Sequence, residues 1–231
     1  MAGIVVVASQ KGGCGKTTLS AHLAGRLREL DPQRPLICVD ADPQEQLTKW
    51  LGEAAPDVYV ERVHDAESML RNVPLWGDEA DRDTDRPQDQ VSRVVIDCAG
   101  GDSELMRAAM IRADLVVVPC AGSMLDLSAA AATWNMVQLV RDICNNEERP
   151  AMVFAPSRMT PTKVSAEVFE SLSEYEEPIL EPAIPQRASI ADAAGQSAFV
   201  WDLANAGDTA ELMRSACDAI LSRVSPKPWV S

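Results

Sequence analysis

Short apolar runs alternate with longer amphipathic stretches along most of this chain. Five runs rich in Val and Ile predict strands, namely Ile4–Ala8, Leu36–Val39, Val94–Ile96, Leu115–Val118 and Ala151–Ala155. Apolar residues at successive positions are typical of parallel strands buried on both faces. Stretches with helical spacing predict helices at Lys16–Leu30, Ser103–Arg112, Leu125–Cys144, Ala166–Ser173 and Thr209–Arg223. The alternation predicts an α/β fold with a doubly wound, mainly parallel sheet and helices on both faces.

The length of the chain suits one domain. With 231 residues, it can build a single sheet covered on both faces. We expect that domain to span residues 1–224 and an irregular tail to occupy 225–231, where two prolines stand close together. The segment Trp76–Gln90 is strongly charged and nearly free of apolar residues. It predicts a solvated loop before the next strand, with a partner-docking loop as the alternative.

Composition narrows the classes of function. No run of 18 apolar residues occurs, so we expect no membrane association through a spanning helix. The six cysteines form no C-x-x-C pair, which favours buried thiols in a reducing, cytoplasmic setting over a disulfide or zinc framework. The net charge of −14 argues weakly against nucleic acid, because DNA binding would need a local basic patch.

A glycine-rich loop follows the first predicted strand and leads directly into a helix. The loop spans Ser9–Thr18 and contains Gly12, Gly13 and Gly15. Glycines let the backbone turn its N–H groups inward as an anion-binding nest, and the helix start adds its positive dipole end. Cys14 sits among them, and we expect it to fill the loop as a small side chain, with a nucleophilic thiol as the alternative.

Three polar side chains at the end of this loop match the chemistry of a triphosphate site. We expect Lys16 to reach the β- and γ-phosphates and Thr17 to offer its hydroxyl to Mg²⁺. Thr18 is placed to bond the α-phosphate. The strand, loop and helix order is the context that this motif requires, so the sequence predicts a phosphate-binding loop.

Carboxylates end two further predicted strands. Asp40 and Asp42 follow Leu36–Val39, and alternation along an extended chain points both the same way. Asp97 follows Val94–Ile96 and fits a carboxylate that holds Mg²⁺ through water. In such folds ligands bind at the carboxyl ends of the strands. An alternative role for Asp42 is to cap a following helix that has Pro43 as its first residue.

The loop resembles the deviant Walker A box of the ParA/MinD superfamily, whose pattern is K-G-G-x-G-K-[ST]-[ST]. The hallmark of that box is an additional lysine at its start, which is Lys11 in this chain. The resemblance implies that Lys11 of one subunit reaches the phosphates bound by the other subunit. ATP would then complete a homodimer, and Lys11 and Lys16 would both act on the phosphates.

The same resemblance extends to the carboxylates and to later loops. It implies that Asp42 orients the attacking water, while Asp40 supports Mg²⁺ and the loop lysine. It also implies that loops at Pro156–Arg158 and Pro185–Arg187 flank adenine, so that Arg158 and Pro185 contact the base. Asp126 would belong to the dimer interface, with simple capping of its helix as the alternative.

The chain is most similar to the small ParA-type plasmid partition ATPases. This resemblance implies an ATP/ADP-binding, Mg²⁺-dependent ATPase that positions or segregates DNA and is slow without a ParB-like or other small adaptor protein. Non-specific DNA binding is common in that branch, but residues 141–231 hold eight Lys or Arg against fourteen Asp or Glu. That departure leaves DNA binding open.

Three alternatives carry other functions on the same fold. The first is an ATP-clasped recruitment module of a conjugative DNA-transfer complex. The second is a membrane-bound division-site ATPase, which the tail after Ser225 does not favour because it forms no basic amphipathic helix. The third is a nitrogenase-reductase-like iron–sulfur protein using Cys98 and Cys120, against which buried strand thiols are the commoner interpretation.

Overall fold

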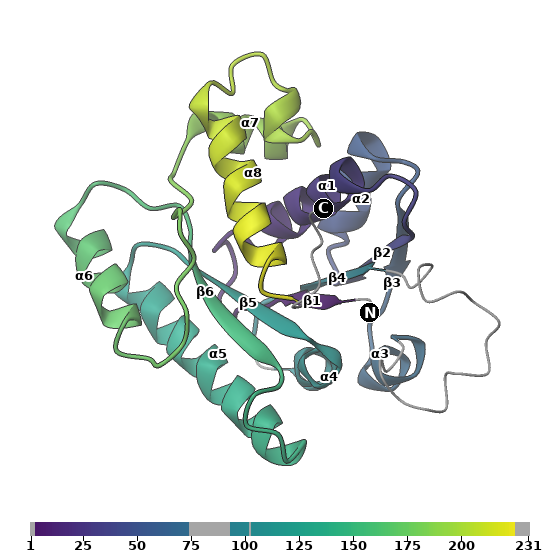
Figure 1. The fold of residues 1–231 in the computed structure, drawn as a ribbon, viewed down its shortest axis with the longest axis vertical. Coiled ribbons are helices and arrows are strands. Elements are labelled where there is room, and N and C mark those ends of the chain that lie inside the picture. The colour runs from purple at the N-terminus through teal and green to yellow at the C-terminus, as the bar shows by residue number, and fades with distance from the viewer. Residues whose placement is uncertain (1–2, 74–92, 102, 225–231) are drawn as a thin grey trace.

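A six-stranded parallel sheet forms the centre of the molecule, with strand order β3-β2-β4-β1-β5-β6 (Figure 1). The computed structural model describes residues 3–73, 93–101 and 103–224. The strands are β1 Ile4–Val7, β2 Leu36–Ala41, β3 Tyr59–Arg62, β4 Arg93–Cys98, β5 Leu115–Cys120 and β6 Ala151–Pro156. The charged segment Trp76–Gln90 and the tail 225–231 lie outside the described residues, so both expectations stay predictions.

Helices cover both faces of the sheet (Figure 1). One face carries α1 Lys16–Leu30, α2 Gln46–Ala54, α7 Ala188–Gly195, the short 3₁₀ helix η3 Val200–Asp202 and α8 Asp208–Leu221. The other face carries α3 Ala66–Asn72, α4 Glu104–Arg112, α5 Met124–Ile143 and α6 Lys163–Leu172. The doubly wound α/β fold predicted from the sequence is therefore confirmed.

Alternation along β1 explains why its sequence is apolar at every position. Val5 and Val7 pack into the core beneath α1 and α8, whereas Ile4 and Val6 pack into the core beneath α4 and α5. A strand with a helical layer on each side has no face for polar residues. The strands are parallel, so their carboxyl ends all lie at the same edge of the sheet. The loops after β1, β2 and β4 come together there.

Most predicted elements are present with small shifts at their ends, and several others were not predicted. Helix α6 begins at Lys163, three residues before the predicted start, because Thr162 caps it by accepting a hydrogen bond from Ser165 N. The elements absent from the prediction are β3, α3, α7 and η3, and α2 was foreseen only in the alternative that places a helix directly after Asp42. Of these, α2 and α7 both border the candidate site.

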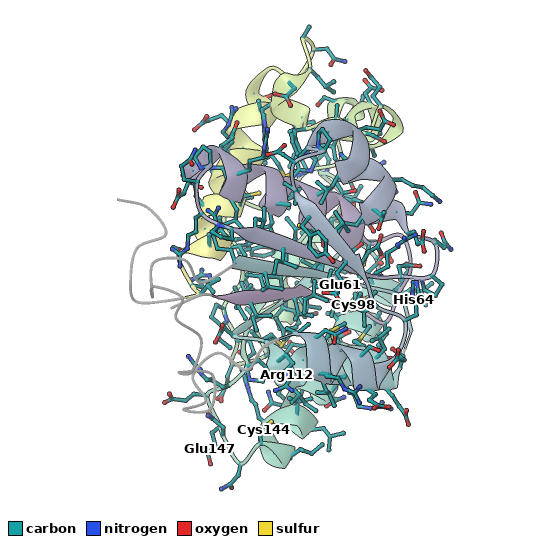
Figure 2. The ribbon with its side chains drawn as sticks, turned by 90° about the vertical axis from the view of Figure 1, so that its right-hand side faces the viewer. Glu61, His64, Cys98, Arg112, Cys144 and Glu147 are labelled. Atoms are coloured by element: carbon teal, nitrogen blue, oxygen red, sulfur yellow. The ribbon has the colours of Figure 1, made fainter. Side chains whose placement is uncertain are left out.

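The cysteines are thiols, and five of the six are buried. Cys98 lies inside the fold, whereas Cys144 is exposed just beyond the end of α5 (Figure 2). Burial raises the pKa of the Cys120 thiol to about 12 and also raises the pKa of Cys98. Cys98 and Cys120 are buried inside the chain, with 2% and 0% of their surface exposed, whereas a cluster shared between subunits needs cysteines at the subunit surface, so the iron–sulfur alternative is not supported. None of the helices in the described ranges has both the length and the apolar character needed to cross a bilayer.

Candidate nucleotide site

The loop between β1 and α1 has the backbone shape that its glycines predict. Gly13 and Gly15 take positive φ angles of 76° and 100°, which side chains disfavour. Gly15 stands at the N-terminal boundary of α1, so the free amides of the first helical turn follow it directly. The loop therefore presents N–H groups and a helix N-terminus at one point, as anion binding requires.

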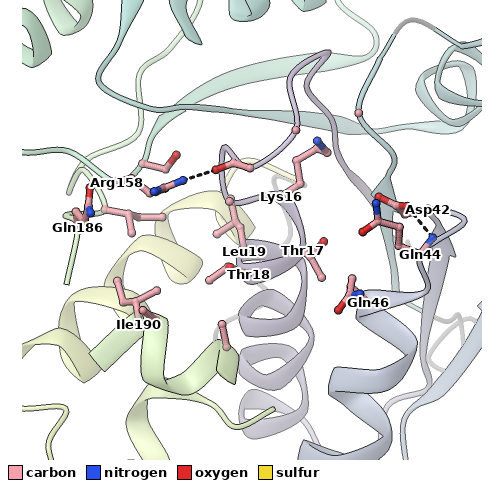
Figure 3. Close-up of a pocket in the computed structure, with 18 of the residues that line it drawn as sticks. Lys16, Thr17, Thr18, Leu19, Asp42, Gln44, Gln46, Arg158, Gln186 and Ile190 are labelled. Carbon is pink, nitrogen blue, oxygen red and sulfur yellow. Dashed lines mark hydrogen bonds between the residues drawn. The ribbon is translucent and has the colours of Figure 1, made fainter. Parts of the chain in front are cut away.

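Three side chains hold the carbonyl groups of the loop. Lys16 Nζ donates to Lys11 O at 2.8 Å. Ser157 Oγ donates to Cys14 O at 2.7 Å, and Arg158 Nη1 donates to Gly13 O at 2.6 Å. Figure 3 shows the Arg158 bond and the Lys16 side chain. Because these carbonyls are engaged by side chains, the loop is preformed before any phosphate binds.

A buried carboxylate lies behind the start of α1. Thr17 Oγ1 donates to Asp97 Oδ2 at 2.7 Å, and Ser20 Oγ donates to Asp97 Oδ1 at 3.0 Å. Loss of solvent raises the pKa of the Asp97 carboxyl to about 7, although both hydroxyls act in the opposite direction. Asp97 is thus fully buried, within one hydroxyl of the cavity, and poorly stabilised as an anion.

The two carboxylates at the end of β2 lie in different environments. Asp40 is fully buried, and its Oδ2 accepts bonds from the N–H and the hydroxyl of Thr48, both at 2.8 Å. Asp42 lines the cavity and accepts a hydrogen bond from Gln44 N at 2.9 Å (Figure 3). Asp40 fastens the end of β2 to α2, while Asp42 stands at the cavity wall.

The capping roles given as alternatives for Asp42 and Asp126 are both wrong. Asp42 closes a turn and does not cap α2, because that helix begins at Gln46 with Glu45, in a left-handed conformation, before it. Asp126 does not occupy the cap of α5, which belongs to Ser123. Asp126 stands three residues later, and its backbone N–H bonds back to the Ser123 hydroxyl at 3.3 Å.

A cavity of about 1330 Å³ joins these groups at the sheet edge. Most of the predicted site residues line it, namely Gly12, Gly13, Gly15, Lys16, Thr17, Thr18, Asp42, Arg158 and Pro185. Lys11, Cys14, Asp40 and Asp97 are not among its lining residues. Cys14 is buried with its Sγ 3.4 Å from Lys11 O, which agrees with a loop-filling role.

The loops carrying Arg158 and Pro185 lie side by side at one end of the cavity. Met159 N donates to Ile184 O at 3.1 Å, and Gln186 N donates to Met159 O at 2.9 Å. Arg158 has a positive φ of 51°, which turns the chain so that its side chain reaches the phosphate loop. The two loops therefore meet at the cavity, and their contact with a base stays a prediction.

An apolar wall at the same end was missed by the sequence analysis. It consists of small or apolar side chains from α7 with single contributions from α1 and α8, namely Ile190, Ala191, Ala194, Leu19 and Met213. The spacing of Ile190, Ala193 and Ala194 before Gly195 is a short helical pattern that could have revealed α7. Such a wall suits a flat apolar group next to the phosphate loop.

The signature lysine is directed away from this cavity. Lys11 Nζ lies 2.7 Å from Asp126 Oδ1 on α5, and the lysine side chain keeps 35% of its surface exposed while that of Asp126 keeps 7%. Asp126 also accepts a hydrogen bond from the hydroxyl of Ser123. In this single chain, therefore, Lys16 is the lysine that lines the phosphate cavity.

The residues present fit a magnesium ion held with a nucleotide. Within the described ranges, no cluster of three or more His, Cys, Asp or Glu side chains could hold a metal on its own. Mg²⁺ in a phosphate-loop site takes most of its ligands from phosphate and water, so few protein ligands are needed. Thr17 on the cavity wall and the desolvated Asp97 behind it match that requirement, since a nearby cation would stabilise the carboxylate.

Comparison with known proteins identifies the family of the chain. The profile of the CobQ/CobB/MinD/ParA nucleotide binding domain matches residues 5–198. The maintenance of carboxysome distribution protein A of Halothiobacillus neapolitanus is 30% identical over 94% of this chain and 92% of its own length. Protein ParA of Rhizobium radiobacter is 27% identical over 80% of this chain and 79% of its own length.

A solved structure gives the same picture of the fold. The ATP complex of a singly substituted Cyanothece McdA superposes with a TM-score of 0.71 at 17% identity, covering 98% of each chain. The matched residues 5–198 span the loop between β1 and α1, the three aspartates at the strand ends and the loops that carry Arg158 and Pro185. The chain belongs to the CobQ/CobB/MinD/ParA family of nucleotide-binding domains.

Proposed function

We propose that this protein is a Mg²⁺-dependent ATPase that dimerises around ATP and positions a cargo. The observation that carries the proposal is the cavity at the sheet edge, where Lys16, Thr17 and Asp42 converge on a preformed phosphate loop. The proposal is supported by membership of a nucleotide-binding family and by relatives named for cargo distribution and for ParA.

Binding of the triphosphate follows from the loop. Lys16 now bonds a loop carbonyl, and it would exchange that carbonyl for the β- and γ-phosphates, which are stronger acceptors. Backbone amides from Gly12 to Gly15 would bind the phosphates, and Thr18 would bond the α-phosphate. Thr17 would offer its hydroxyl to Mg²⁺, Asp97 would act on the ion through water, and Asp40 would hold the β2 end in place.

Hydrolysis would depend on Asp42. Its carboxylate lines the cavity, and its turn is fixed by the Gln44 amide and by its own N–H, which donates to Asp40 Oδ1 at 3.2 Å. A carboxylate held at this wall can orient a water molecule against the terminal phosphate and accept its proton. The base would lie at the other end, between Arg158, Pro185 and the apolar wall.

Dimerisation would recruit Lys11. Its amine is bound by Asp126 of the same chain and does not line the chain's own cavity. A lysine outside its own cavity can reach phosphates in a facing subunit if it leaves this ion pair, and the triphosphate supplies the compensating charge. ATP would therefore link the two subunits, and hydrolysis would weaken the link.

Two cargoes are supported by different observations. Similarity to Protein ParA and the small partition ATPases favours DNA, with a ParB-like or other small adaptor stimulating hydrolysis. The relative with 30% identity is named for carboxysome distribution, which favours a protein body as the cargo. In either case the nucleotide-dependent dimer would form the switch and the adaptor would select the cargo, whereas recruitment in conjugative transfer remains the alternative.

The proposal is tested by calorimetry and by gel filtration with a non-hydrolysable ATP analogue and Mg²⁺. The wild type should bind the analogue and elute as a dimer. Lys16→Ala should lose binding by at least about a hundredfold, because a charge-assisted phosphate contact is removed. Lys11→Ala should still bind the analogue but remain a monomer.

Lys163→Ala serves as the matched control, since Lys163 has 90% of its side-chain surface exposed on α6. This control should behave as the wild type in both measurements. A wild type that takes up no nucleotide would overturn the proposed function. A Lys11→Ala protein that dimerises normally would remove Lys11 from the interface.

A further inference from the structure

His22 is a buried residue that links two parts of the chain far apart in sequence. It lies on α1 one turn after Thr18 and has no exposed surface. Its Nδ1 is 2.7 Å from Thr18 O, and because a carbonyl only accepts, Nδ1 carries the proton. Nε2 then accepts the backbone N–H of Val200 at 3.0 Å. The ring thus joins the first turns of α1 to η3.

The segment that receives this bond is fixed at several other points. Trp50 on α2 donates its Nε1–H to Ala198 O at 3.2 Å. Phe199 stacks on Trp201 with ring centroids 5.3 Å apart, and the rings of His22 and Trp201 form a T-shaped pair with centroids 5.2 Å apart. We call the residues Ala198–Trp201 the aromatic link. The aromatic link therefore contacts α1 through His22 and α2 through Trp50.

The aromatic link continues directly from the wall of the cavity. It follows α7, and Ala198 N donates to Ala193 O at 3.0 Å, which ties the link to that helix. Ile190 on α7 and Thr18 on α1 both line the cavity, and Figure 3 shows both side chains. The bonds of His22 thus connect the phosphate side of the cavity at Thr18 to the wall formed by α7.

We infer that His22 is a positioning residue that sets how closely the α7 wall of the cavity approaches α1. The inference rests on the proposed nucleotide site and assigns phosphate binding and nucleoside binding to different parts of it. Phosphate affinity would come from the loop, whereas affinity for the nucleoside would depend on the His22 bond to Val200. Without an acceptor at this position, a buried N–H would lose its partner and the wall would lose its fixed place.

The test compares two ligands in the presence of Mg²⁺, ATP and inorganic tripolyphosphate, by calorimetry. His22→Leu removes both bonds, and His22→Asn can reach only Thr18. His22→Gln can reach Val200 with its amide oxygen. We expect His22→Leu and His22→Asn to weaken ATP binding about tenfold, the loss expected for an unpaired buried donor, with tripolyphosphate affinity unchanged. The His22→Gln protein should bind ATP within about threefold of the wild type.

His64→Gln is the control, because His64 is the second histidine, lies outside the cavity lining and is half exposed beside Glu45 (Figure 2). Should the His22 proteins not fold, Trp50→Phe keeps a ring and removes the bond to Ala198, and it should weaken ATP alone. Equal losses for both ligands, or unchanged ATP binding, would overturn the inference. A wild type that does not bind ATP would instead overturn the proposed function.

Discussion

Three aspartates at the strand ends show how environment divides one residue type into different roles. Asp40 accepts hydrogen bonds from the N–H and the hydroxyl of Thr48, and Asp97 accepts one hydrogen bond from each of two hydroxyls. Asp42 is bonded through its Oδ1 to a neighbouring amide and stands at the cavity wall. Of the three, Asp42 is the one that lines the cavity, so it is the carboxylate in place to meet a water molecule there.

Replacement of Asp42 by Ala should separate binding from hydrolysis. The carboxylate bonds the Gln44 amide within its own turn, whereas Lys16, Ser157 and Arg158 hold the phosphate loop. ATP uptake and the ATP-dependent dimer should therefore persist. Hydrolysis should fall by at least about a hundredfold, the usual loss when a proton acceptor is removed. Phosphate release and gel filtration measure the two effects on the same sample.

The control for this change is Glu53→Ala, which removes an exposed carboxylate from α2 away from the cavity lining. It should leave both rate and dimer unchanged. Normal hydrolysis by the Asp42→Ala protein would remove Asp42 from its proposed role. Loss of the dimer together with hydrolysis would instead assign Asp42 to ATP-dependent assembly.

At the scale of elements, the sequence predicts best what is encoded locally. Strand β1 and helix α1 are recognisable because an apolar run, a glycine loop and a helical pattern follow one another without interruption. Strand β3 is an edge strand whose Tyr59 is 63% exposed, so its pattern lacks the apolar run of a buried strand. Helix α7 is short and built largely from alanine, which gives a weak periodic signal.

The candidate site divides in the same way. Its phosphate side comes from neighbouring residues in one loop and was predicted residue by residue. Its apolar wall combines Leu19, Ile190 and Met213, whose proximity depends on the packing of three separate helices. The bond between His22 and Val200 joins residues 178 positions apart, and a single sequence carries no local sign of it.

The approach of α1 to the aromatic link can be tested with a matched pair of glycines. A Cβ at Gly25 would lie 2.6 Å from Phe199 Cε1, so Gly25→Ala must push the helix and the ring apart. We expect a loss of about 1–3 kcal/mol in the free energy of unfolding, as is usual for overpacking. Urea denaturation measures this loss.

Gly52 on α2 is the control because a Cβ there meets no atom within 4 Å and the residue is exposed. Gly52→Ala should stabilise the protein by about 0.5–1 kcal/mol, since alanine favours the helix more than glycine does. If both variants shifted stability in the same direction, the close contact between Gly25 and Phe199 would not be a determinant of the fold.

At the scale of the whole molecule, buried titratable groups make stability depend on pH in opposing directions. Burial lowers the pKa of His22 to about 4, below its ordinary value near 6.5. Burial raises the pKa of Asp97 to about 7, above the ordinary aspartate value. Acidification therefore weakens the fold through His22, while protonation of Asp97 strengthens it in the nucleotide-free protein. The two effects offset one another between about pH 4 and 6.5.

The His22→Gln variant should reveal how much the titration of His22 contributes to this pH dependence of stability. Above pH 6.5 the histidine is neutral in both the folded and the unfolded chain, so its titration contributes nothing there. As the pH falls toward 4, His22 takes up a proton in the unfolded chain but stays neutral in the folded chain. The free energy of unfolding of the wild type therefore falls by up to about 3 kcal/mol, a loss that the variant does not have. The difference between their free energies of unfolding should thus shift in favour of the variant from about pH 7 to about pH 4.5. Urea titrations at a series of pH values measure it, and a constant difference would mean that His22 accepts a proton within the folded protein.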